Sequence, residues 1–183
     1  MVFRVSRSVW TRLAVVAVFA VAMAYLESAI VVYLRQLFHL SGDLMTVVPP
    51  AGSVWFSVPY FTLLRPGALT AVLPNAQVAT VEVWREAATM VMLVCVGWLA
   101  GTKFKSRFAY FIFAFGVWDI AYYGTLRVLL GWPATLGSMD VLFLIPGPWL
   151  APVFLPMAVS VVWIVGAVLL LRGRSRSRAK TTD

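Results

Sequence analysis

The sequence has few of the residues that soluble enzymes and secreted domains use for chemistry and cross-linking. Only 12% of its 183 residues are charged, and it contains one histidine and one cysteine. Cys95 has no partner for an internal disulfide, and its apolar neighbours predict a small buried side chain. His39 alone is too little for a histidine-based zinc or haem site. A glycine-rich phosphate loop, a paired cysteine motif and a nucleophile elbow are also missing from the sequence, so no motif points to catalysis.

Apolar residues, by contrast, are abundant. They make up 62% of the chain, and its mean hydropathy is +0.90. Soluble domains are roughly half apolar and a quarter charged, so one compact core would leave much of this apolar surface in water. This excess excludes a soluble globular enzyme and favours a membrane protein.

The apolar residues gather in runs long enough to cross a bilayer, which takes about 20 helical residues. The sequence predicts an all-α membrane protein, a four-transmembrane-helix bundle that forms one integral membrane domain over residues 1–183. The first three runs contain a few charged residues, and the fourth contains none and follows a proline cluster. The expected spans are residues 13–34, 78–101, 108–130 and 151–171.

The distribution of positive charge predicts the orientation. The chain has 15 Lys and Arg residues and a formal net charge of +8, and 11 of these residues precede the first span, separate the second from the third, or follow the fourth. The positive-inside rule then places both termini in the cytoplasm, as four spans require. Residues 172–183 are expected to be a flexible basic tail, and because the charge is explained by orientation, no nucleic-acid partner is expected.

A cleaved signal peptide is the alternative for the first segment. Three arginines precede a short apolar stretch, and Ala22-Met23-Ala24 resembles a small-residue cleavage site. Apolar residues resume after Glu27 and carry the run to spanning length, which favours a retained span.

The two long connections on the outer side are apolar and rich in proline. Residues 53–64 are too short to span and contain Pro59, so we expect an interfacial or re-entrant segment there. Asn75 is placed to cap the second span. The connection over residues 131–149 has the same character, so two apolar, proline-rich caps are predicted on the outer side.

Three carboxylates reach a similar depth on three spans. At about 1.5 Å per residue, Glu27 lies about 21 Å, Glu86 about 22 Å and Asp119 about 17 Å from the inner end of its span. A charged side chain at the centre of a bilayer costs roughly 2.5–3.5 kcal/mol, so these carboxylates are expected to face the bundle interior.

Helical spacing extends this cluster. The candidate ligand- or proton-binding residues are Glu27, Glu82, Arg85, Glu86, Asp119, Tyr123 and Arg127, with Arg35, His39 and Asp140 at the outer rim. In a structural interpretation, arginines neutralise the acids and fix helix register. In a functional one, a vestibule open to the outside binds protons or a cation, because the acids outnumber Arg85 at this depth. No metal ligand set is predicted from the sequence, and a cofactor is left open.

Three functions remain open at this point. The leading hypothesis is a non-catalytic protein that binds or moves protons or a cationic ligand. The alternative is an accessory subunit or assembly factor of a larger membrane complex, with purely structural charges, and the third is a carboxylate-based membrane enzyme. Four helices form a small platform, so a homo-oligomer or a partner complex is expected in the bilayer.

Two segments carry a resemblance. The segment GVWDIAYYGTLRVLLGWPATLGSMDVLFLIPGPWLAPVFLP, over residues 116–156, and WREAAT, over residues 84–89, resemble uncharacterised multi-pass bacterial membrane proteins. The resemblance implies a bacterial inner (cell) membrane and implies no activity.

Overall fold

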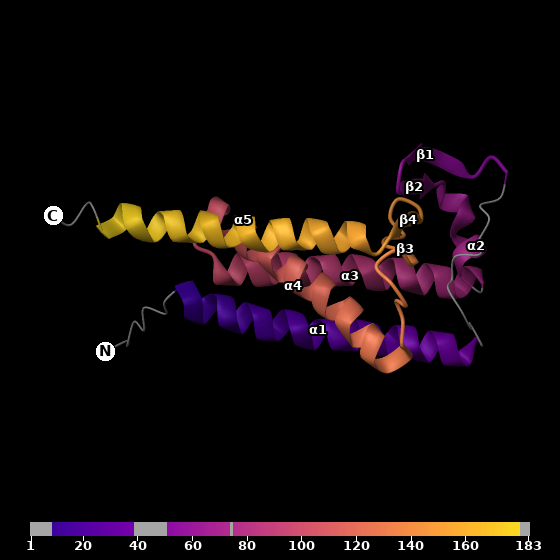
Figure 1. The fold of residues 1–183 in the computed structure, drawn as a ribbon, viewed down its shortest axis with the longest axis horizontal. Coiled ribbons are helices and arrows are strands. Elements are labelled where there is room, and N and C mark those ends of the chain that lie inside the picture. The colour runs from indigo at the N-terminus through magenta and orange to yellow at the C-terminus, as the bar shows by residue number, and fades with distance from the viewer. Residues whose placement is uncertain (1–8, 39–50, 74, 180–183) are drawn as a thin grey trace.

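The computed structural model describes residues 9–38, 51–73 and 75–179, and it is mostly helical (Figure 1). Its long helices are α1 (Val9–Leu37), α3 (Ala76–Ala100), α4 (Phe104–Leu130) and α5 (Phe154–Ala179). A 3-10 turn, η1 (Pro66–Ala68), and a short helix, α2 (Leu69–Val72), precede α3. The strands are β1 (Val54–Val58), β2 (Phe61–Leu64), β3 (Met139–Val141) and β4 (Trp149–Pro152).

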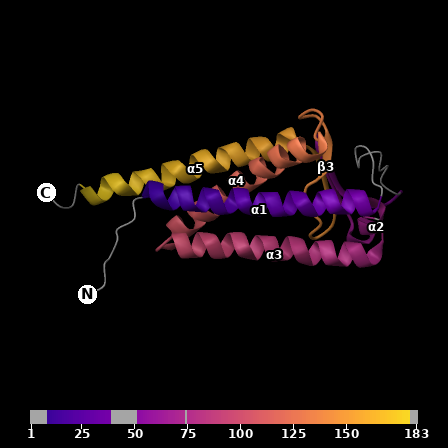
Figure 2. The same ribbon diagram turned by 90° about the horizontal axis from the view of Figure 1, so that it is seen from below.

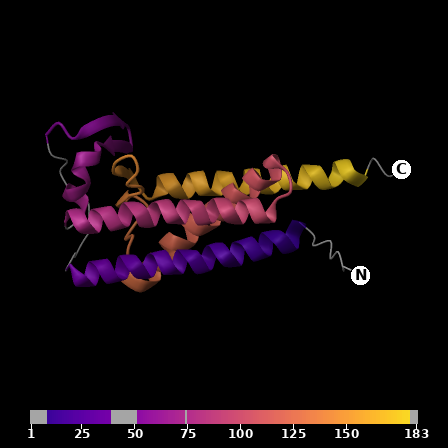
Figure 3. The ribbon, with the colours of Figure 1, turned by 180° about the vertical axis from the view of Figure 1, so that it is seen from behind.

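The long helices alternate in direction along the molecule. The first residue of α1 and the last turn of α5 lie at one end, and the strands lie at the other (Figures 1 and 3). At the first end, Arg12 donates a hydrogen bond to the Ala100 carbonyl oxygen at 3.0 Å, and the Arg172 guanidinium lies 4.6 Å from the centre of the Trp10 ring. Basic side chains therefore join neighbouring helices at this end.

Three of the helices, α1, α3 and the part of α5 up to Arg172, are long and apolar enough to cross a membrane. Helix α4 is long enough but less apolar. It is the central helix: it runs obliquely across the bundle and packs against α1, α3 and α5, whereas α1 and α3 touch each other only lightly (Figures 1 and 2). Because α4 is covered by its neighbours, it can carry polar residues that a lipid-facing helix cannot.

Two glycines allow these close approaches. A Cβ on Gly116 would lie 2.7 Å from the Ser160 carbonyl oxygen of α5, and one on Gly97 would lie 2.8 Å from the Arg107 carbonyl oxygen of α4. Small residues at helix contacts let backbones approach closely in membrane bundles. Gly116 thereby brings α5 close to the face of α4 that carries Asp119.

The two long connections fold together into one cap. Their strands form an antiparallel sheet in the order β1-β2-β4-β3, with Thr62 opposite Leu150 and Asp140 opposite Ala151. The all-α prediction is wrong in this respect, and the segment predicted to be interfacial or re-entrant is a β-hairpin. Residues 54–64 contain β-branched and aromatic residues, which favour strands. Strands from the two connections pair with each other and so satisfy their backbone hydrogen bonds.

The helix boundaries also differ from those expected. Ala151 pairs within β4, so the last helix begins at Phe154 and not near residue 151. The helix continues to Ala179, so residues 172–179 are helical where a flexible tail was expected. Asn75 caps α3 as predicted, accepting a hydrogen bond from the Val78 N–H at 2.9 Å. Cys95 is exposed on α3, so the prediction of a buried side chain is wrong. Apolar neighbours in a membrane helix are as compatible with contact to lipid as with burial in a protein core.

Candidate functional site

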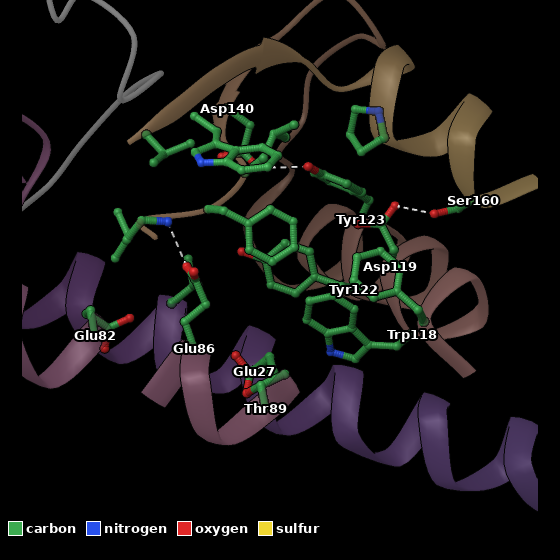
Figure 4. Close-up of a pocket in the computed structure, with 18 of the residues that line it drawn as sticks. Glu27, Glu82, Glu86, Thr89, Trp118, Asp119, Tyr122, Tyr123, Asp140 and Ser160 are labelled. Carbon is green, nitrogen blue, oxygen red and sulfur yellow. Dashed lines mark hydrogen bonds between the residues drawn. The ribbon is translucent and has the colours of Figure 1, made fainter. Parts of the chain in front are cut away.

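A cavity of about 370 Å³ lies beneath the cap, where all four long helices approach the sheet (Figure 4). Eight of the ten residues singled out in the sequence line it. These are Glu27 and Arg35 of α1; Glu82, Arg85 and Glu86 of α3; Asp119 and Tyr123 of α4; and Asp140 of β3. The shared depth of the carboxylates therefore corresponds to a shared cavity.

Two of the ten residues are not on the cavity wall. Arg127 closes the end of α4 and donates hydrogen bonds to the carbonyl oxygens of Gly131 at 2.5 Å and Pro133 at 2.9 Å. Gly131 has a left-handed backbone (φ 68°), which is common just after a helix end. Arg127 thus fixes the turn into the second outer connection. His39 lies outside the described residues.

Glu27 and Glu82, which we call the paired acids, share one arginine. Arg85 forms an ion pair with Glu27 of α1 and, through Nε, with Glu82 of its own helix at 2.8 Å. Glu27 also accepts a hydrogen bond from the Thr89 hydroxyl at 2.6 Å. Both carboxylates are buried, so the network provides the charge compensation that buried carboxylates need. It also joins α1 to α3, which otherwise touch only lightly.

Glu86, Asp119 and Asp140, which we call the unpaired acids, form no ion pair with any described residue. Their partners are neutral donors. Glu86 accepts from the Leu144 N–H, Asp119 from the Ser160 hydroxyl and Asp140 from the Tyr123 hydroxyl, each at 2.8 Å (Figure 4). All three side chains are buried. Each must therefore hold a proton or meet a cation, because hydrogen bonds from neutral groups only partly offset the cost of burying a carboxylate.

Asp140 is the only one of these acids in the cap. Burial raises the pKa of Asp140 to about 6, although the hydrogen bonds from Tyr123 and the Val141 N–H and the attraction of Arg35 lower it. Arg35 is itself held by aromatic contact, with its guanidinium carbon 5.0 Å from the centre of the Trp132 ring. The cap end of the cavity thus holds a carboxyl group that changes charge in mildly acidic solution.

Aromatic side chains form a large part of the cavity wall. Phe115 is at its centre, with ring centroids 5.3 Å from Trp118, 6.1 Å from Phe143 and 4.9 Å from Trp163. We call these four residues the aromatic wall. We call the charged lining of the cavity, which comes from α1, α3, α4 and β3, its charged face, and the aromatic and aliphatic lining, which comes mainly from α4, α5 and the cap, its apolar face.

Three buried donors on the cavity wall have no hydrogen-bond partner among the described residues. They are the Nε atom of Arg35 and the indole nitrogens of Trp118 and Trp149. A buried N–H without an acceptor costs roughly 1–3 kcal/mol, so such groups are uncommon in a finished core. Their positions on one cavity favour a ligand that brings acceptor oxygens.

The described residues contain no group of three or more His, Cys, Asp and Glu side chains arranged to hold a metal ion. No known protein family, curated protein or solved structure matches the chain. Its function must therefore be inferred from the cavity.

Sequence reasoning missed part of this site. Ser160 is the one hydroxyl residue in the uncharged part of α5, residues 154–171, and that isolation was the available signal, because polar side chains in membrane helices turn toward the bundle. Leu144 contributes only its backbone N–H, which no sequence pattern reveals. Trp163 was predicted only as part of an apolar span.

Proposed function

We propose that this chain is a four-helix protein of a bacterial inner membrane that binds protons or a cationic ligand in the cavity beneath its outer cap. Both termini are cytoplasmic in this proposal. The common end of α1 and α5 and the basic side chains gathered there support that orientation. Helix α4 completes the fourth span as the central helix, shielded from lipid by the other three.

One observation carries the proposed function: three buried carboxylates that form no ion pair with a described residue line the same cavity. With Glu27 and Glu82 the cavity has five carboxylates, against the two guanidinium groups of Arg35 and Arg85. A cation in the cavity would supply the missing positive charge, and protons would compete for the same carboxylates. Binding and protonation are therefore coupled at this site.

Calorimetric titration with n-butylammonium tests the proposal on purified protein in a neutral detergent. The wild type is expected to bind it, with an affinity that falls as the pH is lowered. Asp119→Asn and Glu86→Gln should each weaken binding at least about tenfold, or 1.4 kcal/mol. Both changes keep an acceptor oxygen for the existing hydrogen bond, so folding should be preserved.

Asp183→Asn is the matched control, since it makes the same chemical change at the last residue of the sequence, and it should leave binding unchanged. Folded variants that bind like the wild type would show that the charges serve only structure. That result would favour the role of an accessory subunit. Mass spectrometry of proteins that copurify with the chain in mild detergent would then detect its partners.

A further inference from the structure

We infer that the ligand of this cavity is an amphiphile with a primary ammonium head group, which enters from the bilayer beside α5. The inference rests on the proposed cation site and names the class of cation. It follows from the two faces of the cavity, from where the cavity reaches the outer surface, and from the donors that have no partner.

The charged face suits an ammonium group. Asp119 has one hydrogen bond from a neutral donor, and Glu86 and Asp140 have two each, which still leaves carboxylate lone pairs free. A primary ammonium has three N–H donors and a full charge, so it can donate to one of these carboxylates and offset the charge of the others at longer range. A metal ion would need a convergent ligand set, which the described residues do not provide.

The apolar face suits a hydrocarbon chain. Leu155 and Val159 of α5 line the cavity together with the aromatic wall. At about 370 Å³ the cavity is within the usual range for small-molecule sites, which are mostly apolar with a few placed polar groups. A small hydrated cation would leave this face without a partner.

The cavity reaches the outer surface of the bundle within the membrane-length part of α5. Val159 lines the cavity and is also 40% exposed. It lies five residues after Phe154, about 8 Å along a helix whose membrane-length part extends to Arg172. In a bilayer this residue would face lipid tails, so we place the entry of the hydrocarbon chain beside Val159.

The donors without partners point to oxygen atoms near the head group. The indole N–H of Trp118 is more than nine-tenths buried and lacks an acceptor, as does the N–H of Trp149. An aminophospholipid would bring phosphodiester and ester oxygens together with its ammonium, whereas a free hydrophobic amine would bring the ammonium alone. The two sources share the ammonium and the chain, and the experiment separates them.

The experiment uses the full chain in nanodiscs of phosphatidylglycerol. Bromine atoms on a lipid chain quench a tryptophan only at contact, and Trp118 and Trp163 line the cavity. Brominated phosphatidylethanolamine should quench more fluorescence than brominated phosphatidylglycerol, and Asp119→Asn should abolish the excess. Added dodecylammonium should relieve the excess quenching by displacing the lipid.

Soluble and amphiphilic amines are then compared directly. Dodecylammonium should bind at least about tenfold more tightly than n-butylammonium, because burial of only two further methylene groups contributes about 1.6 kcal/mol. Val159→Trp should reduce that advantage by obstructing the opening. Val162→Trp makes the same change on α5 at a residue that is 67% exposed and does not line the cavity, and it should retain the full advantage.

The outcomes separate this inference from the proposed function. Equal binding of the two amines would overturn the inference and leave the cation site intact, whereas binding of neither would overturn both. Equal quenching by the two lipids, with dodecylammonium still preferred, assigns the site to free hydrophobic amines. Excess quenching by phosphatidylethanolamine that dodecylammonium relieves assigns it to aminophospholipids.

Discussion

The paired and the unpaired acids line the same cavity and are equally well buried, yet they are stabilised in opposite ways. Glu27 and Glu82 have Arg85 as a common counter-ion. Glu86, Asp119 and Asp140 have a backbone N–H, a serine and a tyrosine. The first arrangement neutralises the negative charge within the protein. The second leaves negative charge that a bound proton or cation can neutralise.

This difference predicts that the two groups of acids have different roles, one in stability and one in binding, although they are similar in the sequence. The paired acids join α1 to α3, so their main effect should be on stability. The partners of the unpaired acids come from α4, α5 and the cap, where helix packing and the sheet already hold the backbone. Loss of an unpaired acid should therefore impair binding more than folding.

Removal of Arg85 is expected to have the largest effect. Arg85→Met replaces the aliphatic part of the arginine with a side chain of similar length but removes the charge. Glu27 and Glu82 are then buried without their counter-ion. Breaking a buried ion pair by removing one partner costs about 3–5 kcal/mol. The free energy of unfolding, measured by denaturant titration in detergent, should fall by about this amount.

Arg65→Met is the control for that change, because Arg65 is an exposed arginine in the cap. It should change the free energy of unfolding by less than about 0.5 kcal/mol. Adding Glu27→Gln to Arg85→Met should restore part of the loss by removing one uncompensated charge. Equal effects of Arg85→Met and Arg65→Met would refute the structural role of the paired acids.

Asp140 should give the next largest effect, visible as a pH dependence. Its pKa is about 6 in the fold, against 3.8 for an ordinary aspartate, so the folded chain holds this proton more tightly than the unfolded chain. The stabilising contribution is complete below pH 3.8 and is lost as the pH rises through 6. A rise in the pKa of Asp140 from 3.8 to about 6 corresponds to a change of at most about 3 kcal/mol in the free energy of unfolding.

Asp140→Asn should remove this part of the pH dependence. Thermal unfolding of the wild type and the variant, followed between pH 4 and pH 7, measures the difference. As the pH rises, the melting temperature of the variant should increase relative to that of the wild type. Above the pKa of Asp140 the difference between the two should become constant. Parallel curves would show that Asp140 titrates normally in the fold.

The sequence predicted the helices and most of the site, because both depend on where the few charges sit within apolar runs. Glu27, Glu86 and Asp119 could be placed by helical rise alone, and all three line the cavity. The cap could not be placed in this way. Its sheet pairs Thr62 with Leu150, two residues far apart in the chain, and strand pairing over such a distance leaves no periodic signal. Arg127 does not line the cavity, and its place could not be predicted because spacing shows the face of a helix but not that its last turn needs a cap.

The smallest expected effect comes from two hydroxyl groups that donate to acids of different kinds. Ser160→Ala removes the side-chain donor to Asp119, whereas Thr89→Val leaves Glu27 with Arg85. The free energy of unfolding in detergent should fall by about 1–3 kcal/mol for Ser160→Ala and by about 1 kcal/mol or less for Thr89→Val. Saturating n-butylammonium stabilises every variant that binds it, so each variant is compared with the wild type at the same ligand concentration. The difference from the wild type should shrink for Ser160→Ala and stay unchanged for Thr89→Val, because only Asp119 is open to an external cation. Equal recovery in both variants would mean that the two groups of acids do not differ in what they leave for a ligand.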